Sequence, residues 1–317
     1  MIDVLLVSLG GTTGLRAADL ELAASMRRAG ASVEMVSVPR VREWRTMAAI
    51  ELAWAVSARR ATAAALQSTS PRAIVYSSVT AALLAPAPGA VRFDAPAAGN
   101  RPGRHGLWQR PVERRRLAGA PLLVPWSSGG LAEAPSPRAD AVVVPVPVAP
   151  SGPAGARDIA AITYGAHPEK KGLDRVLAAW ARARRPEEEL VVAGLAGTDQ
   201  DGVRFTGMLP RGDYRALLRR ARAFVTAPRR EDYGIAQLEA LADGCLLVTT
   251  PSAGPYAALP LARALDPRLV STDLASALRA ALDDPVPGYD GVGAVAPWRP
   301  EAVDAVVAGE LLPRLLR

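Results

Sequence analysis

The sequence alternates short apolar runs with segments of helical periodicity, and this alternation limits the possible folds more than any other feature. The runs lack polar alternation, which is typical of strands buried on both faces of a parallel sheet. Strands of this kind separated by helices predict a doubly wound α/β sheet. The alternation begins with runs at residues 3–8, 33–38 and 73–78 and helical patterns at about 16–29 and 46–67.

The alternation is interrupted once and then restarts. Residues 145–157 hold four Pro and two Gly without periodicity, which is typical of an interdomain linker. We therefore expect two Rossmann-like domains, at residues 1–148 and 149–317, with a last helix that packs either on its own domain or back on the first. The second set comprises runs at 159–165, 189–194, 223–228 and 245–251 and helical patterns at about 172–184, 213–222 and 235–243.

The composition excludes several other classes of protein. At 317 residues and 50% hydrophobic, the chain is too apolar for disorder. Its single cysteine, Cys245, excludes an intramolecular disulfide and a cysteine-rich zinc site. The sequence shows neither a basic leader nor an apolar stretch near the ~20 residues that span a bilayer. We expect a cytoplasmic protein, with peripheral contact at the inner face of the plasma membrane as an alternative.

The net charge of +7 lies entirely in the first 150 residues, which hold 17 Arg against 10 acidic residues. Six arginines fall within residues 101–116, around Leu107 and Trp108. Such a cluster beside apolar side chains can engage anionic lipid headgroups or an anionic acceptor, although a solvated Arg-rich helix fits equally well. No stacking or recognition-helix pattern accompanies the charge, so we do not expect nucleic acid as a partner.

Two loops carry residues suited to phosphate. Gly10 and Gly11 follow the first run and allow close approach of a ligand to a helix N-terminus, or simply a tight turn. The dinucleotide pattern G-x-G-x-x-G fails because its first position is Leu9, which weakens an NAD-binding interpretation. The only two lysines, Lys170 and Lys171, are adjacent between a run and a helical pattern. A lysine there can neutralise phosphate oxygens, although a solvated pair is a common alternative.

A third loop carries two carboxylates with seven residues between them. Glu231 follows the run at 223–228, Gly234 permits a turn, and Glu239 lies about one turn into the helix that follows. Two carboxylates so placed could bind two sets of sugar hydroxyls, or each could be solvated separately.

Together these segments resemble the retaining glycosyltransferases of the GT-B fold, family four. That family has the pattern E-x(7)-E with an aromatic-Gly pair after the first Glu, matched here by Glu231, Tyr233-Gly234 and Glu239. Its Gly-Arg-x(4)-Lys-Gly stretch is matched at Gly165 and Lys171, whereas the Arg position is Ala166. The resemblance covers most of residues 159–255 and, more loosely, residues 1–40. It implies a GT-B fold, in which two Rossmann-like domains face each other across a cleft.

The resemblance also implies an activity and its residues. The protein would transfer a sugar, with retention of configuration, from a nucleotide-diphosphate sugar to an acceptor. Glu231 would contact hydroxyls of the donor sugar, Glu239 would bind the ribose, and Lys171 would hold the diphosphate. The implied donor site is completed by Gly10, Gly11, Gly165, Tyr233, Gly234 and Ile235. Lys170, His167, Arg229 and Arg230 are candidates to replace the missing Arg charge.

The first domain would bind the acceptor. Family members often place a His near the reacting carbon, and His105 is the candidate, with a surface His in a loop as the alternative. Arg92 and Asp94 end the run at 90–94, where an open sheet faces a ligand, although a salt-bridged strand end is the alternative. Arg104 belongs to the arginine cluster and is a further acceptor candidate.

Cationic groups at the departing phosphate serve the chemistry that the resemblance implies, so we expect neither a metal nor a cofactor beyond the nucleotide-sugar. A phosphorylase-like enzyme would need a lysine for pyridoxal phosphate, and both lysines lie in the diphosphate loop. The remaining alternative is a non-catalytic protein of the same fold that binds a nucleotide-sugar. The donor base, its sugar, the acceptor and the oligomeric state are not encoded in these patterns.

Overall fold

A computed structural model describes residues 2–42, 44–101, 103–136 and 140–317, without the side chains of residues 13, 100, 104 and 105. Its internal contacts divide the chain into two compact units. Unit 1 comprises Met1–Pro147 and Pro300–Arg317, and unit 2 comprises Val148–Arg299. Residues 300–317 thus belong to unit 1, which corresponds to the expected alternative of a last helix that packs back on the first domain.

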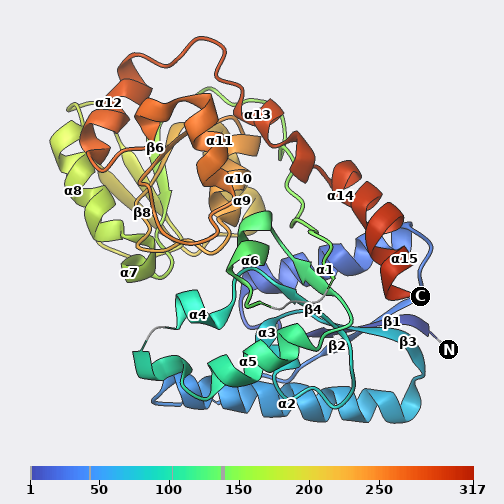
Figure 1. Ribbon diagram of the computed structural model, residues 1–317. Coiled ribbons are helices and arrows are strands. Elements are labelled where there is room, and N and C mark those ends of the chain that lie inside the picture. Colours follow the sequence, from blue (N-terminus) through green and yellow to red (C-terminus); the bar gives the residue numbers. More distant parts are fainter. Residues whose placement is uncertain (1, 43, 102, 137–139) are drawn as a thin grey trace. The chain divides into compact units, whose positions relative to one another are not determined.

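Unit 1 is built on a parallel sheet with strand order β2-β1-β3-β4-β5 (Figure 1). Alternate residues of β1 point to opposite faces, so Leu5 and Val7 join one buried cluster and Val4 and Leu6 join another. A strand buried on both faces is what the continuous apolar run predicts. The strands are β1 (Ile2–Ser8), β2 (Val33–Ser37), β3 (Pro71–Tyr76), β4 (Ala90–Phe93) and β5 (Leu123–Pro125).

Helices cover both faces of this sheet (Figure 1). The face of Leu5 packs against α2, α3 and α5, and the face of Leu6 packs against α1 and the C-terminal helical segment. Asp304 fastens that segment, because its carboxylate accepts from Ser25 Oγ at 2.5 Å and Arg28 Nε at 2.6 Å. The helical elements of unit 1 are α1 (Thr13–Arg28), α2 (Met47–Ser68), α3 (Val79–Ala82), α4 (Ala97–Asn100), η1 (Gly103–Gly106), α5 (Gln109–Ala118), α6 (Ser128–Glu133), α14 (Pro300–Val306), η4 (Val307–Leu311) and α15 (Leu312–Leu315).

Unit 2 holds a second parallel sheet, with strand order β10-β9-β6-β7-β8. Trp180 of α8 and Leu278 of α12 are buried against one face, and α9 and α10 pack against β6, β9 and β10 on the other (Figure 1). The strands are β6 (Ile159–Tyr164), β7 (Leu190–Ala193), β8 (Val203–Gly207), β9 (Ala221–Thr226) and β10 (Leu246–Thr249). The helical elements are α7 (Pro168–Lys171), α8 (Leu173–Ala183), α9 (Arg211–Arg220), α10 (Ile235–Ala242), α11 (Ala258–Leu265), η2 (Pro267–Leu269), α12 (Leu274–Asp283), α13 (Gly291–Ala294) and η3 (Ala296–Trp298).

Two doubly wound parallel sheets confirm the predicted fold class. The strand β8 was not predicted, because an edge strand is half exposed and lacks a continuous apolar run. In each sheet the strand order reverses next to the first strand, between β1 and β3 in unit 1 and between β6 and β9 in unit 2. Ligands of such sheets bind beyond the carboxyl ends of the strands at this switch point. Within the described residues, none of the helices combines the length and the apolarity that crossing a bilayer requires.

Candidate functional site

The loops that follow β6 and β9 meet at the switch point of unit 2. The two strands pair in parallel, with Ile162 opposite Phe224, so their following loops leave the sheet side by side. The amide of Arg229 donates to the carbonyl of Lys170 at 3.1 Å. Gly172 has φ +64°, and a Cβ added there would lie 1.9 Å from the carbonyl oxygen of Ala227. Only glycine therefore allows this approach of the two loops.

Lys171 and Glu231 form the central pair of the site. Lys171 Nζ lies 2.6 Å from Glu231 Oε2, and Gln237 Nε2 donates to the same oxygen at 3.0 Å. The Glu231 side chain is only 6% exposed, while that of Lys171 is 20% exposed. The Glu231 amide donates to the Ala253 carbonyl at 3.0 Å, which anchors the loop. The structure thus brings together two residues that the sequence separates by 60 positions.

Asp232 holds the other lysine. Lys170 Nζ and Arg230 Nε each lie 2.8 Å from an oxygen of the buried Asp232 carboxylate. Burial works against the charged carboxylate, but these two cations, Lys170 first, hold the pKa of Asp232 below its usual value. Asp232 therefore remains a carboxylate that fixes a cation on each side.

The helix α10 places Glu239 at the same edge of the sheet. Gly234 precedes this helix with φ +90°, and Ile235 is its first residue. Arg211 Nη2 donates to Glu239 Oε1 at 2.8 Å and Arg215 Nη1 donates to it at 3.4 Å. Both arginines belong to α9, so the Glu239 carboxylate links two helices.

Two further donor-site candidates lie in the same region. Gly165 is buried directly after β6, and its amide donates to the Ala193 carbonyl at 2.7 Å. The Tyr233 hydroxyl accepts from Trp298 Nε1 at 3.0 Å, which orients the ring just before α10.

The candidates for the missing Arg charge occupy different environments. Arg229 pairs with Asp174 at 3.0 Å and is 45% exposed at its side chain, and Lys170 is 50% exposed. His167 is exposed and adopts φ +57°, a conformation that few residues other than glycine hold. Ala166 itself is half-buried.

The unit 1 candidates do not form one cluster of described side chains. Gly10, with φ +54°, and the exposed Gly11 lie between β1 and α1. Arg92 is 1% exposed, its Nη1 lies 3.2 Å from Asp19 Oδ1, and its guanidinium stacks 4.8 Å from the Trp126 ring centroid. Contact of Arg92 with an acceptor would require this buried pair to open.

Asp94 is half-buried, and its Oδ1 accepts from the Ala95 amide at 2.8 Å. The side chains of Arg104 and His105 lie outside the described part of the structure.

Four side chains of this site were not found from the sequence. Two of them reach Glu239 from α9, one reaches Glu231 from α10, and one contacts Lys170 from the position after Glu231. A partial signal exists, since the arginines at 211 and 215 are spaced to share one face of a helix, as are the acidic residues at 239 and 243. The four are Arg211, Arg215, Asp232 and Gln237.

Over the described residues, no group of three His, Cys, Asp or Glu side chains is arranged as a metal site. The cations of the site are side chains of lysine and arginine.

Solved structures of other proteins share the two doubly wound parallel sheets of this chain. Sucrose-phosphate synthase from Thermosynechococcus elongatus superposes with a TM-score of 0.70 and 17% identity, over 99% of both chains. The UDP-forming α,α-trehalose-phosphate synthase from Burkholderia xenovorans superposes with a TM-score of 0.70 and 13% identity, over 99% of this chain and 100% of the other. The fold is GT-B.

Sequence comparison finds relatives for part of the chain. Residues 152–285 match the sequence model of the family described as glycosyl transferases group 1. Glycogen synthase from Mycobacterium tuberculosis strain CDC 1551 / Oshkosh is 37% identical over 134 residues. The alignment covers 37% of this chain and 32% of the relative. Glycogen synthase from strain ATCC 25618 / H37Rv matches with the same identity and coverage. The chain thus matches about a third of the length of these relatives. The family match is confined to residues 152–285, which lie within unit 2.

Proposed function

We propose that this protein is a retaining glycosyltransferase that uses a nucleotide-diphosphate sugar as its donor. One observation carries the proposal: the Lys171–Glu231 pair lies at the switch point of the unit that matches the family model. A cation and a carboxylate 2.6 Å apart can separate to bind the two ends of a sugar diphosphate. The donor base is proposed to be uracil, because one structural neighbour is named as UDP-forming.

The proposed chemistry follows from the charges. When the bond between sugar and diphosphate breaks, negative charge grows on the phosphate and positive character grows on the sugar ring. Lys171 would stabilise the phosphate, and the amides at Tyr233, Gly234 and Ile235 at the start of α10 would assist it. Glu231, released from Lys171, would accept from the sugar hydroxyls, while Gln237 keeps its carboxylate oriented. Glu239 would accept from the ribose hydroxyls.

We further propose that the reaction needs no metal, since side-chain cations would take the role of a divalent ion at the diphosphate. Activity that persists in EDTA would support this, and activity restored only by added Mg²⁺ or Mn²⁺ would contradict it.

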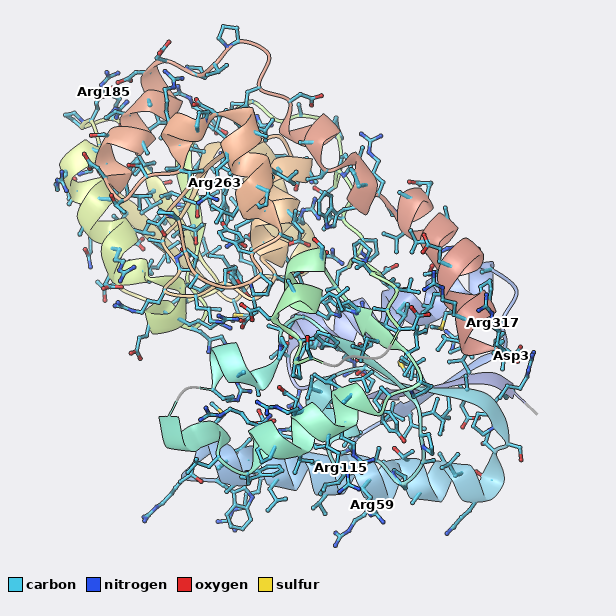
Figure 2. All side chains as sticks on the ribbon, viewed as in Figure 1. Asp3, Arg59, Arg115, Arg185, Arg263 and Arg317 are labelled. Carbon is cyan, nitrogen blue, oxygen red and sulfur yellow. The ribbon has the colours of Figure 1, made fainter. Side chains whose placement is uncertain are left out.

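The acceptor is proposed to be anionic and presented at a membrane surface. Residues 1–150 carry the whole net charge, and the arginines among them include Arg59 on α2 and Arg115 on α5 (Figure 2). Trp44, Met47 and Leu107 are 56%, 44% and 65% exposed. Large exposed apolar side chains beside arginines fit a surface with anionic lipid headgroups. Vesicles with phosphatidylglycerol should bind the protein, and equal binding to phosphatidylcholine vesicles would contradict this.

A thermal-shift panel of UDP, GDP, ADP and their sugar derivatives tests the donor proposal. A ligand at 100 times its Kd stabilises the folded protein by about 2.7 kcal/mol, which shifts the melting temperature by several degrees. Release of nucleoside diphosphate from the selected donor then tests turnover, and Glu231→Gln should lower its rate. No shift with any nucleotide would refute the donor site.

One observation favours a second candidate, a non-catalytic protein that binds nucleotide-sugars. The diphosphate-binding Arg expected from the family pattern is Ala166 here. A melting shift with nucleotide, combined with no donor turnover and no effect of Glu231→Gln on cellular glycosylation, would select this candidate.

A further inference from the structure

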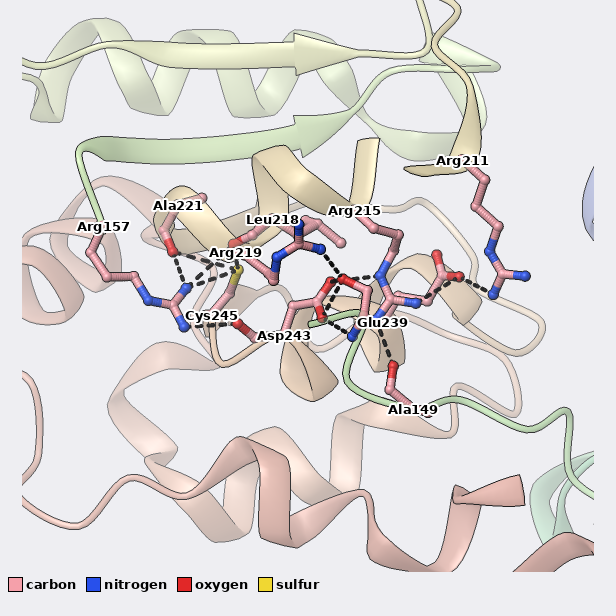
Figure 3. Close-up of polar contacts among 11 residues, drawn as sticks. Ala149, Arg157, Arg211, Arg215, Leu218, Arg219, Ala221, Glu239, Asp243 and Cys245 are labelled. Carbon is pink, nitrogen blue, oxygen red and sulfur yellow. Dashed lines mark hydrogen bonds and ion pairs between the residues drawn. The ribbon is translucent and has the colours of Figure 1, made fainter. Parts of the chain in front are cut away.

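A buried arginine of unit 2 joins three groups from two separate segments of the chain. Arg215 Nε donates to Asp243 Oδ2 at 2.5 Å, its Nη1 donates to Glu239 Oε1 at 3.4 Å, and its Nη2 donates to the Ala149 carbonyl at 2.7 Å (Figure 3). Its side chain is 6% exposed. Each of its three nitrogens therefore has a different partner.

Asp243 extends this network to the chain segment at residues 149–151. Its side chain is 0% exposed and accepts at Oδ1 from the Ser151 amide at 2.8 Å and from Ser151 Oγ at 2.9 Å. Glu239 and Asp243 are four residues apart on α10 and its C-cap, so Arg215 contacts both carboxylates on one face. Residues 149–151 follow closely on Pro147, where the chain leaves unit 1.

Arg215 stays charged although it is buried. Burial works against the guanidinium, but the hydrogen bond to Asp243 and the charge of Glu239 raise the pKa of Arg215. A guanidinium is planar and rigid, so its three nitrogens move together. The contact to Glu239 is the longest of the three, at 3.4 Å. If Glu239 shifts and shortens this contact, the whole guanidinium must move. Its Nε, which donates to Asp243, and its Nη2, which donates to Ala149, are then displaced as well.

We propose that Arg215 is a positioning residue for Glu239, and that through Asp243 it couples nucleotide binding to residues 149–151. The inference rests on the proposed role of Glu239 at the ribose. Hydroxyls bound to Glu239 draw the carboxylate into a defined position, Arg215 follows it, and the bonds to Ala149 and Ser151 tighten. By reciprocity, loss of the Ser151 bonds weakens nucleotide binding.

Arg215→Lys tests the positioning role, because lysine keeps the charge but cannot reach three partners. Arg220→Ala is the matched control, since Arg220 also lies on α9, is 49% exposed at its side chain and has Asp158, outside the network, as its described partner. By calorimetry, Arg215→Lys should weaken UDP binding about tenfold, the loss of a charged hydrogen bond, and Arg220→Ala should leave it within about 1.5-fold of wild type, as expected for a surface ion pair. The KM for the donor should rise in Arg215→Lys while kcat stays near wild type.

Hydrogen exchange tests the coupling. In the wild type and in Arg220→Ala, UDP should slow amide exchange in residues 149–157, and in Arg215→Lys it should not. Ser151 is exposed, so Ser151→Ala keeps the test valid if Arg215→Lys does not fold. Ser151→Ala should weaken UDP binding about two- to threefold, the loss of one weak hydrogen bond.

Unchanged UDP affinity in Arg215→Lys and Ser151→Ala, or unchanged exchange at residues 149–157 in the wild type with UDP bound, would overturn the inference while the proposed function stands. Absence of binding by UDP, GDP and ADP to the wild type would instead overturn the proposed function and the inference with it.

Discussion

Replacing Lys171 by Met is the most direct perturbation of the proposed donor site. The substitution removes the ammonium 2.6 Å from Glu231 and leaves a carboxylate with 6% exposure that still accepts a hydrogen bond from Gln237. Breaking a fully buried ion pair costs about 3–5 kcal/mol, and the 20% exposure of Lys171 reduces this to roughly 2 kcal/mol of unfolding free energy. Loss of a charge that stabilises the departing phosphate lowers kcat by about 10²–10³.

The double variant Lys171→Met, Glu231→Gln separates these two effects. Removing the unpaired carboxylate should restore most of the lost stability, because a neutral amide is cheaper to bury. It should not restore activity, since the phosphate still lacks its cation. Arg175→Met, an exposed cation in the first turn of α8, is the control for net charge.

Denaturant unfolding and steady-state release of nucleoside diphosphate measure these effects. We expect Arg175→Met to lie within about twofold of wild type in kcat, as a screened surface charge should. The reasoning is refuted if Lys171→Met retains kcat within about threefold, or if the double variant is less stable than Lys171→Met.

Two further predictions concern stability. Gly172→Ala should destabilise unit 2 by about 3 kcal/mol or prevent folding, because its Cβ would meet the Ala227 carbonyl at 1.9 Å. Gly212→Ala on α9 is the control, because the space around Gly212 is open. In thermal melts this control should be neutral or stabilising by up to ~1 kcal/mol. Burial raises the pKa of Glu113 from 4.5 to about 7, so the folded state binds an extra proton in that window and stability falls as pH rises from about 4.5 to 7. Glu113→Gln should remove about 3 kcal/mol of this pH dependence; equal pH slopes for both proteins would contradict it.

The predicted strands and helices came from local patterns, and most were placed correctly because strands buried on both faces require continuous apolar runs. The candidates Lys171, Glu231 and Glu239 came from the family resemblance, and the structure brings the loops that carry Lys171 and Glu231 together because β6 and β9 are neighbours in the sheet. β8 was missed because an edge strand needs apolar residues on only part of its surface.

The sequence by itself determined the two parallel α/β layers and the loops that carry the candidate chemistry. Only the tertiary structure decided which charges meet. Lys171 forms an ion pair with Glu231, Lys170 forms one with Asp232, and Arg215 forms ion pairs with both Glu239 and Asp243. The physical reason is that apolar periodicity is a local property of the chain, whereas a buried ion pair depends on contacts between segments that the sequence separates by 24 to 62 positions.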